Sequence, residues 1–224
     1  MQNINVVIGI EGTVGAGKTS ICRKLLEKIE NSIILHGGNI YRAIVYEMSK
    51  SEENIQRFKE IDVYEMMREF EIDVKLEDRE TVIYIKGKKI EEKYLQSNKS
   101  SILVSQVSNI ANNKKLYQFG KNLIDEFRKK YNIILSSRDI VKMYPDVTYH
   151  FFIDASIEER VNRKYIQYNR KLSKDEIRKM IEERDKLQKE TGYYKIYPQT
   201  KIVDVTECNT VEDATEKVFR NIKL

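Results

Sequence analysis

The chain has 224 residues, of which 41% are hydrophobic and 33% charged, as in a soluble globular protein with a full core. No apolar run approaches the roughly 20 residues that cross a bilayer, and the N-terminus lacks a basic signal segment, so we expect a cytoplasmic protein. Two cysteines and two histidines, far apart in sequence, exclude a disulfide framework and argue against a Cys/His zinc site. The net charge of +5 is concentrated in residues 160–195, which indicates an anionic ligand or a solvated helix pair.

The first fifty residues alternate between predicted strands and helices. "NVVIGI" (5–10) is a β-branched apolar run typical of a strand buried on both faces, and a helix with one apolar stripe follows over 19–30. A second strand is predicted at 32–36 and a second helix at 39–49. This alternation predicts a parallel sheet with right-handed crossovers.

The middle of the chain departs from this alternation. Residues 70–90, "FEIDVKLEDRETVIYIKGKKI", contain two alternating segments around a polar turn, which predicts an antiparallel hairpin inside an insertion of roughly 52–100. A helical pattern resumes over 101–130. Further strands are predicted at 132–137, 148–154 and 201–205, and helix starts at Ser156 with Glu159, Ser173 with Glu176, and Thr210 with Asp213. The sequence therefore predicts an α/β fold with a parallel five-stranded sheet flanked by helices.

A phosphate-binding motif lies between the first strand and the first helix. "GTVGAGKT" (12–19) matches the pattern G-x-x-x-x-G-K-[ST] in the context that the motif requires. We expect its backbone N–H groups to bind ATP phosphates, Lys18 to reach the β- and γ-phosphates, and Thr19 to ligate Mg²⁺. The predicted ATP-binding residues here are Gly12, Thr13, Val14, Gly15, Ala16, Gly17, Lys18, Thr19 and Ser20. A chance glycine-rich turn is the alternative.

Candidate residues for an acceptor substrate follow the second and third strands. "LHGGNIYRAI" (35–44) places a glycine pair before Tyr41 and Arg42, and "IILSSRDI" (133–140) ends in Arg138 and Asp139. Ligands of this fold class collect at the carboxyl ends of the strands, where an arginine can bind phosphate bidentately. The alternative is that these are ordinary surface arginines and a surface salt bridge.

The basic segment contains a further candidate. Arg184 falls on the apolar stripe of a predicted helix, and an arginine there is rarely left unpaired. We expect it to point into a phosphate-binding cleft or to pair with an internal acid. Arg160 and Arg163, on the preceding helix, suggest a two-helix basic lid, and Arg160 is a further candidate for ATP binding. The basic residues lack the aromatic pattern of single-strand binders, so we expect no nucleic-acid partner.

In order and spacing, these pieces resemble the cytidylate kinase family, P-loop kinases that transfer a phosphoryl group from ATP to CMP or dCMP. The resemblance runs nearly end to end, from "GIEGTVGAGKTS" through "GGNIYRAI", "SRDI" and "EERD" to "KIVDVTECNTVEDATEKV". It implies one P-loop NTPase domain over 1–224, with a monophosphate-binding insertion at 36–108 and a lid at 157–195. It also implies ATP with Mg²⁺ as donor, a nucleoside monophosphate as acceptor, no membrane partner and a monomer.

The resemblance implies roles for individual residues. Lys18, Arg138 and Arg184 are the implied catalytic residues. The implied substrate-binding residues are Gly38, Tyr41, Arg42, Ser108, Arg138, Asp139 and Arg184, and the implied metal ligand is Thr19, with Glu11 and Asp139 as further candidates.

Some positions depart from the family's pattern. His36 stands where the family usually has an acid, Ser136 and Ser137 replace Asp-Gly before Arg-Asp, and Tyr117 aligns loosely with a base-contacting arginine. Because phosphoryl transfer depends on positioning and charge neutralisation, a missing metal-organising acid can cost orders of magnitude in rate. Two alternatives therefore stay open. One is a nucleotide-binding regulatory or degenerate protein with little turnover, and the other is a nucleoside or small-metabolite kinase on the same fold.

Overall fold

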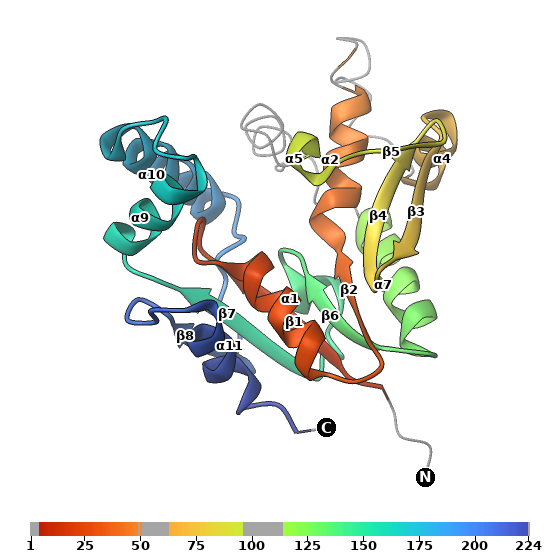
Figure 1. The fold of residues 1–224 in the computed structure, drawn as a ribbon. Coiled ribbons are helices and arrows are strands. Elements are labelled where there is room, and N and C mark those ends of the chain that lie inside the picture. The colour runs from red at the N-terminus through yellow and green to blue at the C-terminus, as the bar shows by residue number, and fades with distance from the viewer. Residues whose placement is uncertain (1–4, 49, 51–62, 96–113, 224) are drawn as a thin grey trace.

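The computed structural model describes residues 5–48, 50, 63–95 and 114–223 (Figure 1). Among these residues the sheet has eight strands, and seven of them follow the order β3-β4-β2-β6-β1-β7-β8, with β5 paired to β4. The predicted base contact Ser108 and the part of the predicted helical pattern over 101–113 lie outside the described residues.

The predicted five-stranded parallel sheet is confirmed. It consists of β1 (Val7–Gly12), β2 (Ser32–His36), β6 (Asn132–Ser136), β7 (Tyr149–Asp154) and β8 (Thr200–Asp204). β1 lies at its centre and pairs in parallel with both β6 and β7. All five strands therefore end at one edge of the sheet, where the phosphate loop leaves β1.

The predicted hairpin is also confirmed, and it extends the same sheet. β3 (Ile72–Glu77) and β4 (Glu80–Ile85) pair antiparallel, and β5 (Lys88–Lys89) adds a short third strand. The start of β4 pairs in parallel with β2 through Ile34 and Glu80. The hairpin is thus a continuation of the central sheet.

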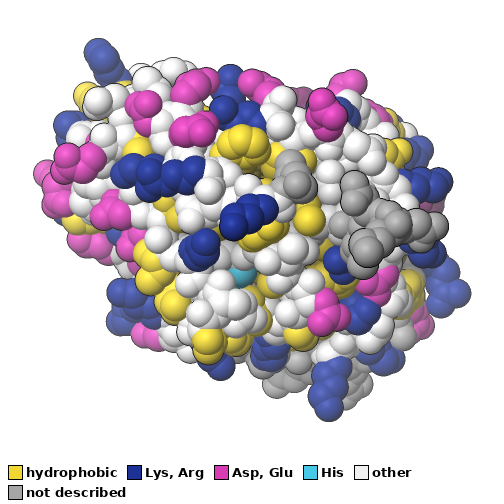
Figure 2. Space-filling view, turned by 90° about the horizontal axis from the view of Figure 1, so that it is seen from below, with side chains coloured by type: hydrophobic (Ala, Val, Ile, Leu, Met, Phe, Trp, Pro, Cys, Tyr) yellow, Lys and Arg dark blue, Asp and Glu magenta, His cyan; other side chains and the backbone are white. Residues whose placement is uncertain are grey.

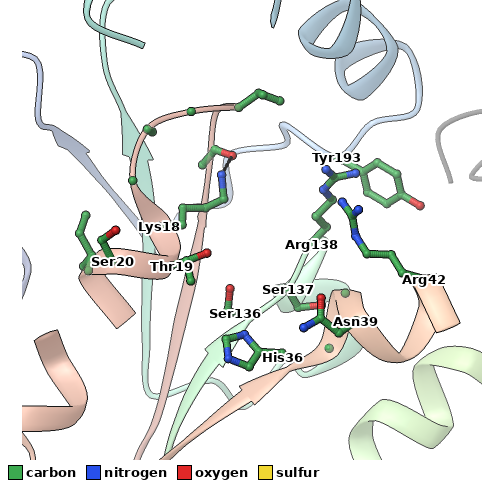
Figure 3. Close-up of a pocket in the computed structure, with 18 of the residues that line it drawn as sticks. Lys18, Thr19, Ser20, His36, Asn39, Arg42, Ser136, Ser137, Arg138 and Tyr193 are labelled. Carbon is green, nitrogen blue, oxygen red and sulfur yellow. Dashed lines mark hydrogen bonds between the residues drawn. The ribbon is translucent and has the colours of Figure 1, made fainter. Parts of the chain in front are cut away.

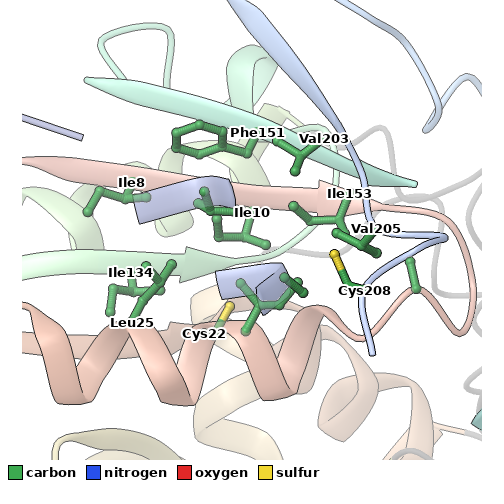
Figure 4. Packing of buried hydrophobic residues seen from close by; sticks show 14 of the residues in the cluster. Ile8, Ile10, Cys22, Leu25, Ile134, Phe151, Ile153, Val203, Val205 and Cys208 are labelled. Carbon is green, nitrogen blue, oxygen red and sulfur yellow. The ribbon is translucent and has the colours of Figure 1, made fainter. Parts of the chain in front are cut away.

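Two apolar layers cover the parallel sheet. α1 (Lys18–Lys28) and α11 (Val211–Phe219) pack on one face, in the cluster drawn in Figure 4 that includes Ile10, Leu25 and Phe151. α7 (Lys114–Arg128) and α8 (Ile140–Met143) pack on the other face. Successive residues of β6 alternate between the layers, since Ile134 belongs to the first and Ile133 and Leu135 to the second. A strand buried on both faces explains the continuous apolar runs.

A second core lies under the hairpin. α2 (Gly37–Met48), α4 (Val63–Glu69) and α5 (Glu92–Leu95) contribute Ile44, Met66 and Leu95, which pack with Ile83 of β4. α2 begins directly where β2 ends, so its first turn faces the same sheet edge as the phosphate loop.

The last helices before β8 form a separate pair. α9 (Ile157–Gln167) and α10 (Lys174–Glu190) pack through Val161, Ile177 and Ile181 onto Val14 of the phosphate loop. The predicted helix starts are confirmed, because Ser156 caps α9, and Ser173 and Thr210 form capping boxes on α10 and α11. The division into an insertion and a lid stays a prediction.

The surface carries charges of both signs. On the face shown in Figure 2, Lys and Arg side chains are interspersed with Asp and Glu. Ion pairs such as Lys28 with Glu216 and Arg178 with Glu158 join exposed side chains. Within the ranges that the structure describes, no helix combines the length and apolar character of a membrane span.

Candidate active site

A cavity of about 840 Å³ lies at the carboxyl edge of the sheet. Its walls come from the phosphate loop and α1, from the ends of β2 and β6, from α2 and α7, and from α9 and α10. In Figure 1, α9 and α10 rise on one side of this edge, and α2 and α5 on the other. One continuous cavity thus connects the phosphate loop with the candidate acceptor residues.

Two glycines give the phosphate loop a backbone conformation that residues with a side chain rarely adopt. Gly12 has φ 145°, and a Cβ there would lie 2.0 Å from the carbonyl oxygen of Ile153. That close approach allows the backbone N–H of Thr13 to donate to the same carbonyl at 3.0 Å. Gly17, at φ 95°, turns the chain into α1 and places Lys18 and Thr19 at the helix N-terminus. Free N–H groups at a helix start bind phosphate oxygens.

Lys18 is held in the cavity by the loop itself. Its Nζ donates to the carbonyl oxygens of Gly12 at 2.8 Å and Thr13 at 2.7 Å. Burial, followed by the charges of Arg138 and Arg184, lowers the pKa of Lys18 to about 7. A nearby polyanion would counteract both effects through its attraction for the ammonium group, so bound phosphates would favour the charged form of Lys18.

α9 and α10 fix the far side of the loop. The backbone N–H of Val14 donates to the hydroxyl of Tyr194 at 3.1 Å, and that hydroxyl donates to Asp185 at 2.7 Å. Arg160 forms an ion pair with Asp185 and also donates to the carbonyl oxygen of Val14 at 3.2 Å. Arg160 is buried and does not line the cavity. In this arrangement it holds the loop, and direct contact with ATP stays a prediction.

Cationic side chains gather around the cavity. Arg42, Arg138, Lys164 and Arg184 line it together with Lys18. Burial, and then the charges of neighbouring members of this group, lower the pKa of Lys164 to about 8, that of Arg42 to about 9, and that of Arg138 below its ordinary value. Burial also lowers the pKa of Arg184. Figure 3 shows Arg42 and Arg138 converging beside Tyr193, whose ring centroid lies 5.8 Å from Cζ of Arg138. Such mutual repulsion is relieved by bound phosphate groups.

The turn after β6 is anchored from beneath. Asp139 has φ 54°, and its carboxylate accepts hydrogen bonds from the hydroxyls of Tyr117 at 2.6 Å and Tyr197 at 3.2 Å. The next backbone N–H, of Ile140, donates to the buried carboxylate of Glu11 at 2.5 Å. These contacts fix the turn that carries Arg138 into the cavity.

His36 is engaged by the hairpin. Its Nε2 lies 2.9 Å from the carboxylate of Glu80, which also pairs with Arg23 of α1 at 2.9 Å. The hydrogen bond from His36, and then that from Arg23, lowers the pKa of Glu80 to about 2. The side chain of His36 lines the cavity beside Ser136 (Figure 3). An imidazole thus occupies the position where the resemblance implies an acid, and a carboxylate from another element pairs with it.

The donor set suits a magnesium ion that arrives with a nucleotide. The Thr19 hydroxyl is at the cavity beside Lys18. Glu11 and Asp139 do not line the cavity, and their carboxylates accept hydrogen bonds from Ile140 and Tyr117. Across the described parts of the chain, no group of three or more His, Cys, Asp or Glu residues could hold a metal. Mg²⁺ commonly keeps several waters and binds through substrate phosphates plus one or two protein ligands. Thr19 fits that role.

Most of the predicted site residues meet at this cavity. Those that line it are Gly12, Val14, Gly15, Ala16, Gly17, Lys18, Thr19, Ser20, Gly38, Tyr41, Arg42, Arg138 and Arg184. Glu11, Thr13, Asp139 and Arg160 lie behind it, and the predicted base contact Ser108 lies outside the described residues.

Other residues of the site were not predicted. Lys164 lies four positions after Arg160, a helical spacing that could have suggested it. Tyr193 and Tyr194 form a tyrosine pair whose contacts with Arg138 and Val14 no local pattern indicates. Asn209 and Thr210 line the end of the cavity near α11, where the only signal was a helix cap.

Comparisons with known proteins identify the family and similar chains. The family model described as cytidylate kinase matches residues 8–224. The chain is similar to a cytidylate kinase of Clostridioides difficile (strain 630), with 29% identity covering 98% of this chain and 99% of that protein. It is also similar to a cytidylate kinase of Caldanaerobacter subterraneus subsp. tengcongensis, with 30% identity covering 100% of this chain and 97% of that protein. A solved structure of an uncharacterized protein from Eubacterium ventriosum aligns with a TM-score of 0.47 at 14% identity, covering 97% of this chain and 98% of that one.

Proposed function

The chain belongs to the cytidylate kinase family, and we propose that this ATP-dependent nucleoside-monophosphate kinase phosphorylates CMP or dCMP. The observation that supports the proposal is the cation cluster of Lys18, Arg42, Arg138, Lys164 and Arg184 around one cavity. A triphosphate and a monophosphate together supply the negative charge that this cluster requires.

The loop side of the cavity suits the donor. Backbone N–H groups of residues 12–19 would bind the ATP phosphates, and Lys18 would neutralise the β- and γ-phosphates. Thr19 would hold Mg²⁺, which neutralises charge on the phosphates when it is bound. These residues lie on the opposite side of the cavity from Arg42 and Arg138, as Figure 3 shows.

The α2 and β6 side suits the acceptor. Arg42 donates to the carbonyl oxygen of Leu95 at 2.9 Å, and Arg138 lies against the Tyr193 ring, so both guanidinium groups are oriented before a substrate binds. They would hold the α-phosphate of the acceptor, and Arg184, on α10, would neutralise the transferring phosphoryl group. The acceptor phosphate oxygen attacks the γ-phosphorus and the bond to the β-phosphate oxygen breaks. A phosphate dianion is already a nucleophile, so no general base is required.

The test is an assay of ADP release against every nucleoside and deoxynucleoside monophosphate. We expect the highest kcat/KM with CMP or dCMP, and R42M and R138M to raise KM for that acceptor on the order of a hundredfold while the Kd for ATP changes little. Turnover that is fastest with an unphosphorylated nucleoside or a sugar would contradict the proposal. The requirement for Mg²⁺, the cytoplasmic location and the monomeric state stay predictions.

A further inference from the structure

One wall of the cavity is largely apolar. α7 lines it with Leu116, Tyr117, Phe119, Gly120 and Leu123, and Met143 of α8 completes it. A Cβ at Gly120 would lie 2.4 Å from the Met143 sulfur, so the two helices are in close contact here. An apolar wall next to phosphate-binding arginines suits the flat ring of a nucleobase. Tyr117 contributes the hydrogen-bonding side chain of this wall, among the residues that the structure describes.

The hydroxyl proton of Tyr117 is used in a hydrogen bond to a carboxylate. Tyr117 donates to Oδ2 of Asp139 at 2.6 Å, while Tyr197 donates to Oδ1 at 3.2 Å. Asp139 is 8% exposed and does not line the cavity, whereas Tyr117 does. Burial, followed by the hydrogen bond to Asp139, raises the pKa of Tyr117 above its ordinary range, so the phenol stays protonated. A phenol that donates its single proton to a carboxylate can only accept from any other group.

This fixed polarity has a consequence for the base. We propose that Tyr117, oriented by Asp139, is a specificity-determining residue that accepts a hydrogen bond from an exocyclic amine of the acceptor base, an inference that rests on the proposed function. Cytosine and adenine carry such an amine. Uracil, thymine and hypoxanthine carry a carbonyl at the same ring position, and in the same pose its lone pairs would face those of the phenol.

The same geometry assigns Asp139 an indirect role. Its two carboxylate oxygens are each bound by a phenol, and Lys142 approaches Oδ2 at 3.7 Å. Asp139 therefore acts through Tyr117, as a positioning residue, and the group that meets the base is neutral. A neutral acceptor distinguishes amine from carbonyl without adding negative charge beside the substrate phosphate.

The test compares kcat/KM for CMP with UMP, and for AMP with IMP, in the wild type and in Y117F. We expect the wild type to favour the amine-bearing member of whichever pair it accepts, and Y117F to reduce that ratio about tenfold. The matched control is Y197F, which removes the other phenol on Asp139 without touching a cavity-lining residue, and it should keep the wild-type ratio. Thermal melting establishes that both variants are folded, and Kd values for the four monophosphates, from calorimetry, provide the same ratios without turnover.

The outcomes separate this inference from the proposed function. A wild type that uses AMP in place of CMP would overturn the proposed acceptor but support the role of Tyr117, provided that Y117F reduces the AMP/IMP ratio. An unchanged ratio in folded Y117F, measured by kcat/KM or by Kd, would overturn the role of Tyr117 and leave the kinase assignment intact. A wild type that prefers UMP or IMP would also overturn it.

Discussion

The carboxylate of Glu11, in β1, accepts a hydrogen bond from the backbone N–H of Ile140 at 2.5 Å, across the sheet edge. Nε2 of His150 lies 3.2 Å from the same oxygen, and the Glu11 side chain is 4% exposed. The strand that leads into the phosphate loop thus fixes the turn that carries the acceptor-side Arg138. The donor side and the acceptor side of the cavity share one buried carboxylate.

We predict that E11Q weakens this connection. Both donors meet one carboxylate oxygen, and replacing that oxygen with a neutral amide oxygen weakens both hydrogen bonds, so we expect a loss of about 1–3 kcal/mol in the free energy of unfolding. KM for the acceptor should rise more than the Kd for ATP, because Arg138 lies two residues before Ile140. Denaturant unfolding and steady-state kinetics measure both. E207Q, at an exposed glutamate, is the control, and equal effects in the two variants would contradict the prediction.

Binding of ATP should take up protons near pH 8. The pKa of Lys18 is lowered to about 7, and that of Lys164 to about 8, so at this pH the ligand-free protein holds fewer protons than the bound form. Phosphates favour the charged amines, and we expect an uptake on the order of one proton. Calorimetry in buffers of different ionisation enthalpy measures it. K18M should reduce the uptake, and a binding heat independent of the buffer would refute the shift.

The same shift affects stability. A lysine whose folded pKa is lowered from 10.5 to about 7 gives a folded state that binds fewer protons than the unfolded state between those values. The free energy of unfolding of the ligand-free protein should therefore rise with pH across that window, and K18M should flatten this rise.

We predict that Arg160 acts by holding the phosphate loop through Asp185. If so, D185N should raise the Kd for ATP about as much as R160M, on the order of tenfold, because both remove the ion pair that supports Val14. If Arg160 instead bound phosphate directly, R160M would raise the Kd far more than D185N. Calorimetry with ATP distinguishes the two outcomes. R178M, which removes an exposed partner of Glu158, is the control.

The pairing of Glu80 should be visible in acid denaturation. The pKa of this carboxyl is lowered from 4.5 to about 2, so its contribution to stability is complete above about pH 4.5 and is lost as the pH falls toward 2. E80Q should cost about 1 kcal/mol at pH 7 and should reduce the fall in stability between pH 4.5 and 3. Denaturant titrations at these pH values measure it. E77Q, on the same hairpin, should cost less, since Glu77 contacts the half-exposed Lys89 and Tyr84 whereas Glu80 contacts the buried His36.

The sequence was sufficient for the elements that follow from local patterns. Strands β1 and β6 are continuous apolar runs because both of their faces are buried, and the helix caps at Ser173 and Thr210 depend on residues three positions apart. The phosphate loop was predictable because its glycines, lysine and threonine all lie within eight residues. These features are encoded over short distances along the chain.

The rest of the site depends on contacts between distant residues. Tyr117 and Tyr197 meet on Asp139 although eighty positions separate them in sequence, and His36 meets Glu80 only because β4 pairs with β2. In the sequence, Arg160 and Arg184 are alike as arginines on basic helices. Nothing in the helix of Arg160 indicates that it forms an ion pair with Asp185 of the next helix. Whether an arginine lines a cavity or supports its wall is decided by tertiary packing.

The turn of the hairpin is fastened to the body of the protein. The guanidinium of Arg79 donates to the carbonyl oxygens of Leu26, Ile29 and Ser32 and to the Ser32 hydroxyl, and the N–H of Ile34 donates to the Arg79 carbonyl. Excision of residues 70–90 would therefore break these bonds and expose β2 as an edge strand, with backbone groups open to pairing with another chain. For protein engineering, the hairpin is therefore a structural part of the central sheet. A shortened kinase made by deleting it should aggregate through the exposed β2.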